Sequence, residues 1–102
     1  MGYLDAVTRL PKIKLESVTK ITKKEDHWDL TTTITNNTKY PAINLRLKVV
    51  GAKNGKRILP VIYDDNYLIL LPGDHRTVKM ELQNADTMGE EPAVELEGFN
   101  VE

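Results

Sequence analysis

The segment that most constrains this chain is residues 59–74, where an apolar run lies between two turn signals. Residues 64–66 are Asp, Asp and Asn, whose short side chains hydrogen-bond their own backbone and favour turns. Residues 67–71 are short enough for a strand and apolar enough for one that is buried on both faces. Pro72 and Gly73 then supply the fixed φ and the positive φ of a type II turn. This pattern is typical of a β-sandwich.

Alternation of apolar and polar residues predicts the remaining strands, because successive side chains of a strand point to opposite faces. The predicted strands lie near residues 12–22 (with a bulge at Val18), 28–35, 43–49, 58–62, 67–71, 77–83 and 94–99. The predicted core is Trp28, Leu30, Ile34, Ile43, Leu45, Leu47, Val49, Leu68, Leu70, Val78, Met80, Leu82, Val94 and Leu96. About seven short strands with turn signals between them predict an all-β fold, an antiparallel β-sandwich.

Two segments between or before the strands also carry predictions. Asn54 and Gly55 form the strongest hairpin signal, since a type I′ turn needs positive φ at both central residues. Residues 1–11 lack the strand period and end at a proline. They are interpreted as a linker or short helix from a preceding domain, which leaves residues 12–102 for the sandwich.

Length, charge and cysteine content exclude several classes of function. The 102 residues suffice for one domain with a modest core. A net charge of −1 gives no bulk attraction for nucleic acid or an anionic membrane, and no apolar run reaches the roughly 18–20 residues of a membrane span. The absence of cysteine excludes disulfides and thiolate zinc sites. No signal-peptide pattern opens the chain, so we expect a monomeric piece of a longer protein.

Glu95 and Glu97 are the pair of carboxylates whose spacing invites a catalytic interpretation. At positions i and i+2 of a strand, their backbones lie about 6.6 Å apart, as in a glycosidase pair. Such a pair must flank a cleft, and burial must raise the pKa of one member. Both glutamates lie opposite the apolar phase of Val94 and Leu96, so a solvated sheet face is the favoured interpretation. No catalytic residue is predicted.

No metal or cofactor site is predicted either. The oxygens of residues 64–66 suit calcium, yet a calcium site needs six or more oxygens and no ligand-spaced series follows. Turn chemistry is therefore preferred. His27 and His75 each follow an aspartate next to a turn. Neither has a serine or second histidine at motif spacing, so both are interpreted as exposed turn residues.

The aromatic residues and one asparagine raise the question of glycans. Tyr40, Tyr63 and Tyr67 can stack on a sugar or form an interface, whereas Trp28 shares the phase of the core. Asn36 opens an Asn-x-Thr pattern that fits a glycosylation acceptor. Because that pattern is frequent by chance, it carries no prediction.

Two short motifs resemble a known family. Residues 60–67, which end in Asp65-Asn66-Tyr67, are followed by Leu71-Pro72-Gly73 and a strand. This arrangement resembles the C-terminal immunoglobulin-like domain of glycoside hydrolase family 2 enzymes, in the group of exo-β-D-glucosaminidases, β-mannosidases and mannosylglycoprotein endo-β-mannosidases. The resemblance covers residues 10–101. Asp74 is a conservative departure, since relatives often have glutamate there.

The resemblance implies an immunoglobulin-like antiparallel β-sandwich that serves as a non-catalytic accessory module. The catalytic barrel and its two glutamates would lie elsewhere in the parent chain, which would act on β-mannosides or β-glucosaminides. Partners would be the neighbouring domains, and a periplasmic or extracellular parent is consistent with the family. The residues of the structural motif or domain interface would be Tyr63, Asp65, Asn66, Tyr67, Leu71, Pro72 and Gly73. A carbohydrate-binding module and a protein-interaction or adhesion sandwich remain as alternatives.

Overall fold

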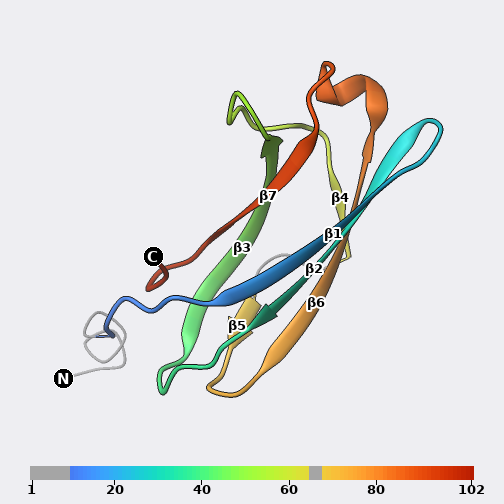
Figure 1. Ribbon diagram of the computed structural model, residues 1–102. Coiled ribbons are helices and arrows are strands. Elements are labelled where there is room, and N and C mark those ends of the chain that lie inside the picture. Colours follow the sequence, from blue (N-terminus) through green and yellow to red (C-terminus); the bar gives the residue numbers. More distant parts are fainter. Residues whose placement is uncertain (1–9, 65–67) are drawn as a thin grey trace.

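The computed structural model describes residues 10–64 and 68–102, and these residues are almost entirely β-structure (Figure 1). The strands are β1 (Glu16–Lys23), β2 (His27–Thr35), β3 (Ala42–Gly51), β4 (Ile62–Tyr63), β5 (Leu68–Leu70), β6 (His75–Gln83) and β7 (Pro92–Glu97). One 3₁₀ turn, η1 (Asn84–Thr87), follows β6. The prediction of about seven strands is confirmed. Residues 1–9 lie outside the described part of the chain, so the linker remains a prediction.

The strands form two antiparallel sheets that face one another (Figure 1). One sheet has the order β1-β2-β6-β4 and the other β5-β3-β7. A division into four and three strands is that of the constant-type immunoglobulin sandwich. No helix among the described residues is long and apolar enough to cross a membrane.

The core lies between the sheets and is largely the predicted one. The predicted residues that are buried there are Leu30, Ile34, Leu45, Leu47, Val49, Leu70, Val78, Met80 and Leu82. Trp28, Val94 and Leu96 are partly buried and pack against this cluster. Ile13, Ala42 and Ile58 also belong to the core, although they were not predicted. The side chain of Leu68 lies outside the described residues.

The prediction that Ile43 is a core residue is wrong, because β3 contains an irregularity that alternation alone does not reveal. The register with β5 shifts between Ala42 and Leu45, and Asn44 has a φ of 54°. Asparagine tolerates this left-handed conformation better than most residues. The shift turns both Ala42 and Leu45 inward, as a bulge does, and leaves Ile43 only half-buried.

The bulge predicted near Val18 is absent from the described pairing of β1. This strand pairs with β2 in continuous register from Glu16 to Lys23, and Val18 is 73% exposed on the outer face. The apolar phase changes between Ile13 and Val18 because Ile13 lies before β1 and not within it. Ile13 precedes the strand and forms a parallel bridge with Val101 near the C-terminus, so the two ends of the described domain are joined.

The apolar run at residues 67–71 is not buried on both faces. β5 is an edge strand that pairs with β3. Leu70 is buried, whereas Ile69 and Leu71 are each 56% exposed. In a two-layer sandwich each strand turns one face to the core and the other outward. Nothing in the described chain covers the outward face of these two residues.

The two predicted turns have different outcomes. At the first, Gly55 has a φ of 68°, but Asn54 is not among the residues with positive φ, so the turn is not type I′. Instead, the Glu90 carboxylate accepts the backbone N–H groups of Lys53 (3.0 Å) and Asn54 (3.1 Å). A carboxylate from a distant loop thus holds a turn that local sequence does not specify.

At the second turn, the prediction holds. Gly73 has a φ of 83°, and the backbone N–H of Asp74 donates to the carbonyl of Leu71 at 3.0 Å. These are the features of a type II turn.

The strand predicted at residues 58–62 is mostly absent. Only Ile62 and Tyr63 pair with β6, and they form the short strand β4.

Candidate functional site

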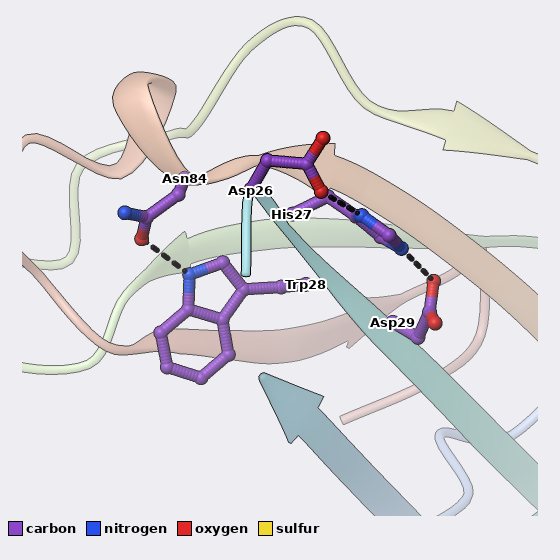
Figure 2. A network of polar contacts seen from close by, with 5 residues as sticks. All are labelled: Asp26, His27, Trp28, Asp29 and Asn84. Atoms are coloured by element: carbon purple, nitrogen blue, oxygen red, sulfur yellow. Dashed lines mark hydrogen bonds and ion pairs between the residues drawn. The ribbon is translucent and has the colours of Figure 1, made fainter. Parts of the chain in front are cut away.

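A polar network lies where β2 begins and β6 ends (Figure 2). His27 Nδ1 is 2.7 Å from Asp26 Oδ1, and His27 Nε2 is 3.5 Å from Asp29 Oδ1. The strand period places His27 and Asp29 on the same face of β2. The register of the sheet puts Glu81 of β6 directly opposite Asp29. The network therefore combines residues that are far apart in the sequence.

The charges of this network favour a protonated His27. The hydrogen bond with Asp26 raises the pKa of His27, and the charges of Asp29, Asp26 and Glu81 add to the effect. The same hydrogen bond lowers the pKa of Asp26. The interpretation of His27 as an exposed turn residue is wrong, since it is the half-buried first residue of β2. His75 is exposed, as predicted, but opens β6 rather than lying in a turn.

Trp28 points to the other side of β2 and is only half-buried. Its Nε1 donates to Asn84 Oδ1 at 3.1 Å, as Figure 2 shows. The ammonium of Lys23 lies 5.3 Å from the centre of the indole ring, within the range of a cation–π contact. A hollow of 310 Å³ lies beside the ring, at the lower end of the range for pockets that bind small ligands. It is lined by Lys23, Trp28, Asn84, Thr87, Gly89, Glu90 and Glu91.

A second hollow, of 460 Å³, lies over β2, β6 and β4. Its polar lining includes Asp29, Lys79 and Glu81, and it also contains Tyr63. The Tyr63 hydroxyl is buried without a hydrogen-bond partner among the described residues. Tyr63 is half-buried and packs against the core, and its role in a structural motif or domain interface remains a prediction.

The other predicted motif residues fall into two groups. Asp65, Asn66 and Tyr67 lie outside the described residues. Residues 71–73 form the exposed type II turn, and the backbone N–H of Gly73 donates to the carbonyl of Asn36 at 2.8 Å. The role of these residues in an interface remains a prediction.

Asn36 is a structural centre that the sequence patterns did not identify. Its side chain is completely buried. The amide nitrogen donates to the carbonyls of Tyr40 (2.8 Å) and Leu70 (3.0 Å), and Oδ1 accepts the N–H of Thr38 at 3.0 Å. The Asn-x-Thr pattern is thus an Asx turn, and the buried amide is not accessible as a glycosylation acceptor in the folded domain.

Asn100 is a second buried asparagine, and its side chain binds the backbone on either side of the start of β3. It is buried, its Oδ1 accepts the N–H of Ile43 at 3.0 Å, and its amide donates to the carbonyl of Pro41 at 2.8 Å. Two buried asparagines therefore hold the segment between β2 and β3. A buried polar side chain with all its bonds satisfied specifies one backbone arrangement.

Two of the carboxylates considered for catalysis or calcium, Glu97 and Asp64, are held by protein groups. Glu97 Oε1 accepts a hydrogen bond from Arg46 Nε at 2.6 Å, and this bond lowers the pKa of Glu97, with help from the charges of Arg46 and Lys48. A general acid needs the opposite shift. Asp64 Oδ1 accepts the backbone N–H of Lys79 at 2.8 Å, which is a turn contact between β4 and β6.

Comparison with known proteins identifies the family. The family described as "Exo-beta-D-glucosaminidase Ig-fold domain" matches residues 1–101. The exo-β-D-glucosaminidase of Amycolatopsis orientalis is 39% identical over 74 residues, which are 69% of this chain and 7% of that protein. The enzyme of the same name from Streptomyces avermitilis is 30% identical over 97 residues, 95% of this chain and 11% of that protein.

A solved structure agrees in three dimensions. The crystal structure of Amycolatopsis orientalis exo-chitosanase CsxA superimposes with a TM-score of 0.87 at 28% identity, over 96% of this chain and 12% of that one. The chain therefore spans about a tenth of the length of these relatives. On the family match and the shared fold together, this chain belongs to the immunoglobulin-fold domain family of exo-β-D-glucosaminidases.

Proposed function

We propose that the chain is a non-catalytic accessory module of a larger glycoside hydrolase, in which it packs against neighbouring domains. The observation that carries the proposal is the size of the match, because relatives align with this chain over only 7% and 11% of their own length. The remainder of such a protein has room for a catalytic domain. Among the described residues, Glu97, one of the two glutamates considered for catalysis, forms ion pairs with Arg46 and Lys48. These ion pairs suit a structural role.

An exposed apolar edge beside β5 supports the packing role. It consists of Tyr40, Ile69 and Leu71, each at least 45% exposed. Asn36 holds this edge together, since its amide binds the carbonyls of Tyr40 and Leu70. Apolar side chains gathered at one place on a surface are typical of an interaction site. A neighbouring domain on this edge would cover the outward face of the apolar run.

The proposed substrate of the parent protein is a β-D-glucosaminide. The relatives above are named exo-β-D-glucosaminidases, and one related structure is a complex with PNP-β-D-glucosamine. β-Mannosides, the other class implied by the sequence motifs, have no such support. Substrate choice would reside in the catalytic domain rather than in this one.

The test compares the pure chain with the full protein encoded by its reading frame. Both are assayed with p-nitrophenyl β-D-glucosaminide and p-nitrophenyl β-D-mannoside. We expect the full protein to hydrolyse the glucosaminide and the pure chain to hydrolyse neither. Turnover by the pure chain would overturn the non-catalytic role, and a preference of the full protein for the mannoside would overturn the substrate assignment.

A second candidate function, carbohydrate binding, is favoured by the hollow at Trp28. The indole ring borders it, and Glu90 and Glu91 contribute carboxylates beside it. Binding sites for small ligands combine an apolar surface with a few polar groups in this way. Titration with glucosamine oligosaccharides should then quench Trp28 fluorescence, which reports this residue alone because the chain has one tryptophan. An unchanged emission spectrum would remove this candidate.

A further inference from the structure

Three side chains capable of binding a metal converge on one face of the four-stranded sheet. One ligand atom from each of His27, Asp29 and Glu81 lies within 4.8 Å of the others. His27 and Asp29 come from β2, and Glu81 comes from β6. All three side chains are half-buried, so solvent can deliver an ion and complete its coordination shell.

The spacing already approaches that of a metal shell. Ligand atoms at about 2.0–2.2 Å from a tetrahedral zinc ion are about 3.3–3.6 Å apart. His27 Nε2 and Asp29 Oδ1 are 3.5 Å apart, so this pair needs almost no movement. Glu81 lies directly opposite Asp29 in the β2–β6 register, and rotation of its side chain would bring the third oxygen into place.

Asp26 orients the imidazole of His27. Its carboxylate is 2.7 Å from Nδ1, on the side of the ring away from Asp29 (Figure 2). When a cation displaces the proton of Nε2, Nδ1–H still donates to this carboxylate, and the lone pair of Nε2 then faces the cation beside Asp29. A carboxylate behind a metal-binding histidine is a recurrent arrangement that fixes the tautomer and increases ligand basicity.

The two carboxylates of the cluster also favour a cation between them. Asp29 and Glu81 are direct cross-strand neighbours, and like charges in this relation destabilise a sheet. A bound cation would convert that repulsion into a link between β2 and β6.

We propose that His27, Asp29 and Glu81 bind one divalent transition-metal ion, with Zn²⁺ as the reference ion and water as the remaining ligand. A set of one imidazole and two carboxylates suits zinc and its neighbours. Calcium and magnesium prefer shells made of oxygen alone. The ion would join the central strands of the sheet and leave an open coordination position toward solvent.

The test is an NMR titration of the chelator-treated full chain with ZnSO₄. The protein has two histidines, and His75 lies at the opposite end of β6 from Glu81, so it serves as an internal control. We expect saturable shifts of the His27 ring resonances near one equivalent, with His75 unchanged and CaCl₂ without effect. Absence of saturable shifts, or equal shifts at both histidines, would overturn the site.

The zinc affinity of variants then tests Glu81 as a ligand and Asp26 as the residue that positions His27. Asp26→Asn should weaken zinc binding by about 10–100-fold, as is usual for the partner behind a metal-binding histidine, and Glu81→Gln should weaken it at least as much. His75→Gln should bind zinc as the original chain does. Thermal unfolding by circular dichroism checks that each variant is folded. Unchanged zinc affinity in folded Asp26→Asn and Glu81→Gln variants would contradict the proposal.

Discussion

The side-chain amide of Asn36 donates a hydrogen bond to the carbonyl of Leu70 over 3.0 Å, and so ties the end of β2 to the edge strand β5. The backbone of Asn36 makes two further bonds to the turn that follows β5, with Asp74 and Gly73. This one residue therefore fixes both the strand and the turn of the exposed apolar edge. The stability of the domain and its proposed interface depend on the same contact.

The first prediction concerns this buried amide. Asn36→Ala should lower the free energy of unfolding by about 2–4 kcal/mol, because each buried polar group left without a partner costs about 1–3 kcal/mol. Urea denaturation followed by tryptophan fluorescence measures the change. The exposed neighbour Asn37 is the matched control, and Asn37→Ala should change the free energy by less than about 0.5 kcal/mol. Equal effects of the two substitutions would contradict the central role of Asn36.

The second prediction concerns the turn at Gly73. A Cβ there would meet no atom within 4 Å, so Gly73→Ala tests the backbone alone. The positive φ of 83° should make this substitution destabilising by about 1–2 kcal/mol. Gly73→Asn should cost less, because asparagine tolerates the left-handed region. Thermal unfolding of both variants measures the difference, and a neutral Gly73→Ala would exclude the type II turn.

A third prediction tests the irregularity at Asn44. Leu45→Ala should cost about 2–5 kcal/mol, the usual effect of truncating a buried leucine. Ile43→Ala should cost clearly less, since Ile43 is only half-buried. Urea denaturation of the two variants compares them directly. Equal costs of the two substitutions would contradict the irregularity, because uninterrupted alternation would bury Ile43 and Leu45 on the same face.

A fourth prediction follows from the ion pair of Glu97 with Arg46. The pair holds the pKa of Glu97 below its ordinary value of 4.5. The stabilisation is therefore present above the ordinary pKa and is lost as the pH falls through the lowered pKa of the folded state. Glu97→Gln should make the unfolding midpoint less sensitive to pH below about 5.

Salt provides the control for this effect. Both partners are partly exposed, and 1 M salt reduces the screening length to about 3 Å. The difference in acid sensitivity between the original chain and Glu97→Gln should therefore shrink in 1 M NaCl. A difference that persists unchanged would indicate a cause other than this ion pair.

The sequence predicted much of the fold because alternation reports burial directly. Leu45, Leu47 and Val49 alternate strictly and are all buried, and the Pro72-Gly73 pair predicted its turn. The wrong predictions arise where the conformation of one residue, or a contact with a distant residue, overrides the local pattern. Asn44 shifts the phase of β3, and the Glu90 carboxylate holds a turn that Asn54 and Gly55 alone would form differently.

The candidate site was harder to predict than the fold. His27 and Asp29 are neighbours on one face of a strand, but Glu81 joins them only through the β2–β6 register. Sequence spacing carries no information about such pairing. Asn36 likewise has no local signal of burial, because its partners Tyr40 and Leu70 lie in two separate segments.

The most direct test of the accessory role is amide hydrogen exchange at Ile69 and Leu71. It should be measured in the isolated chain and in the full protein encoded by its reading frame. We predict that exchange at this exposed edge is slower in the full protein, because a neighbouring domain covers it, while exchange in β2, an inner strand of its sheet, changes little. Equal exchange at Ile69 and Leu71 in both proteins would contradict the packing of this edge against a neighbouring domain.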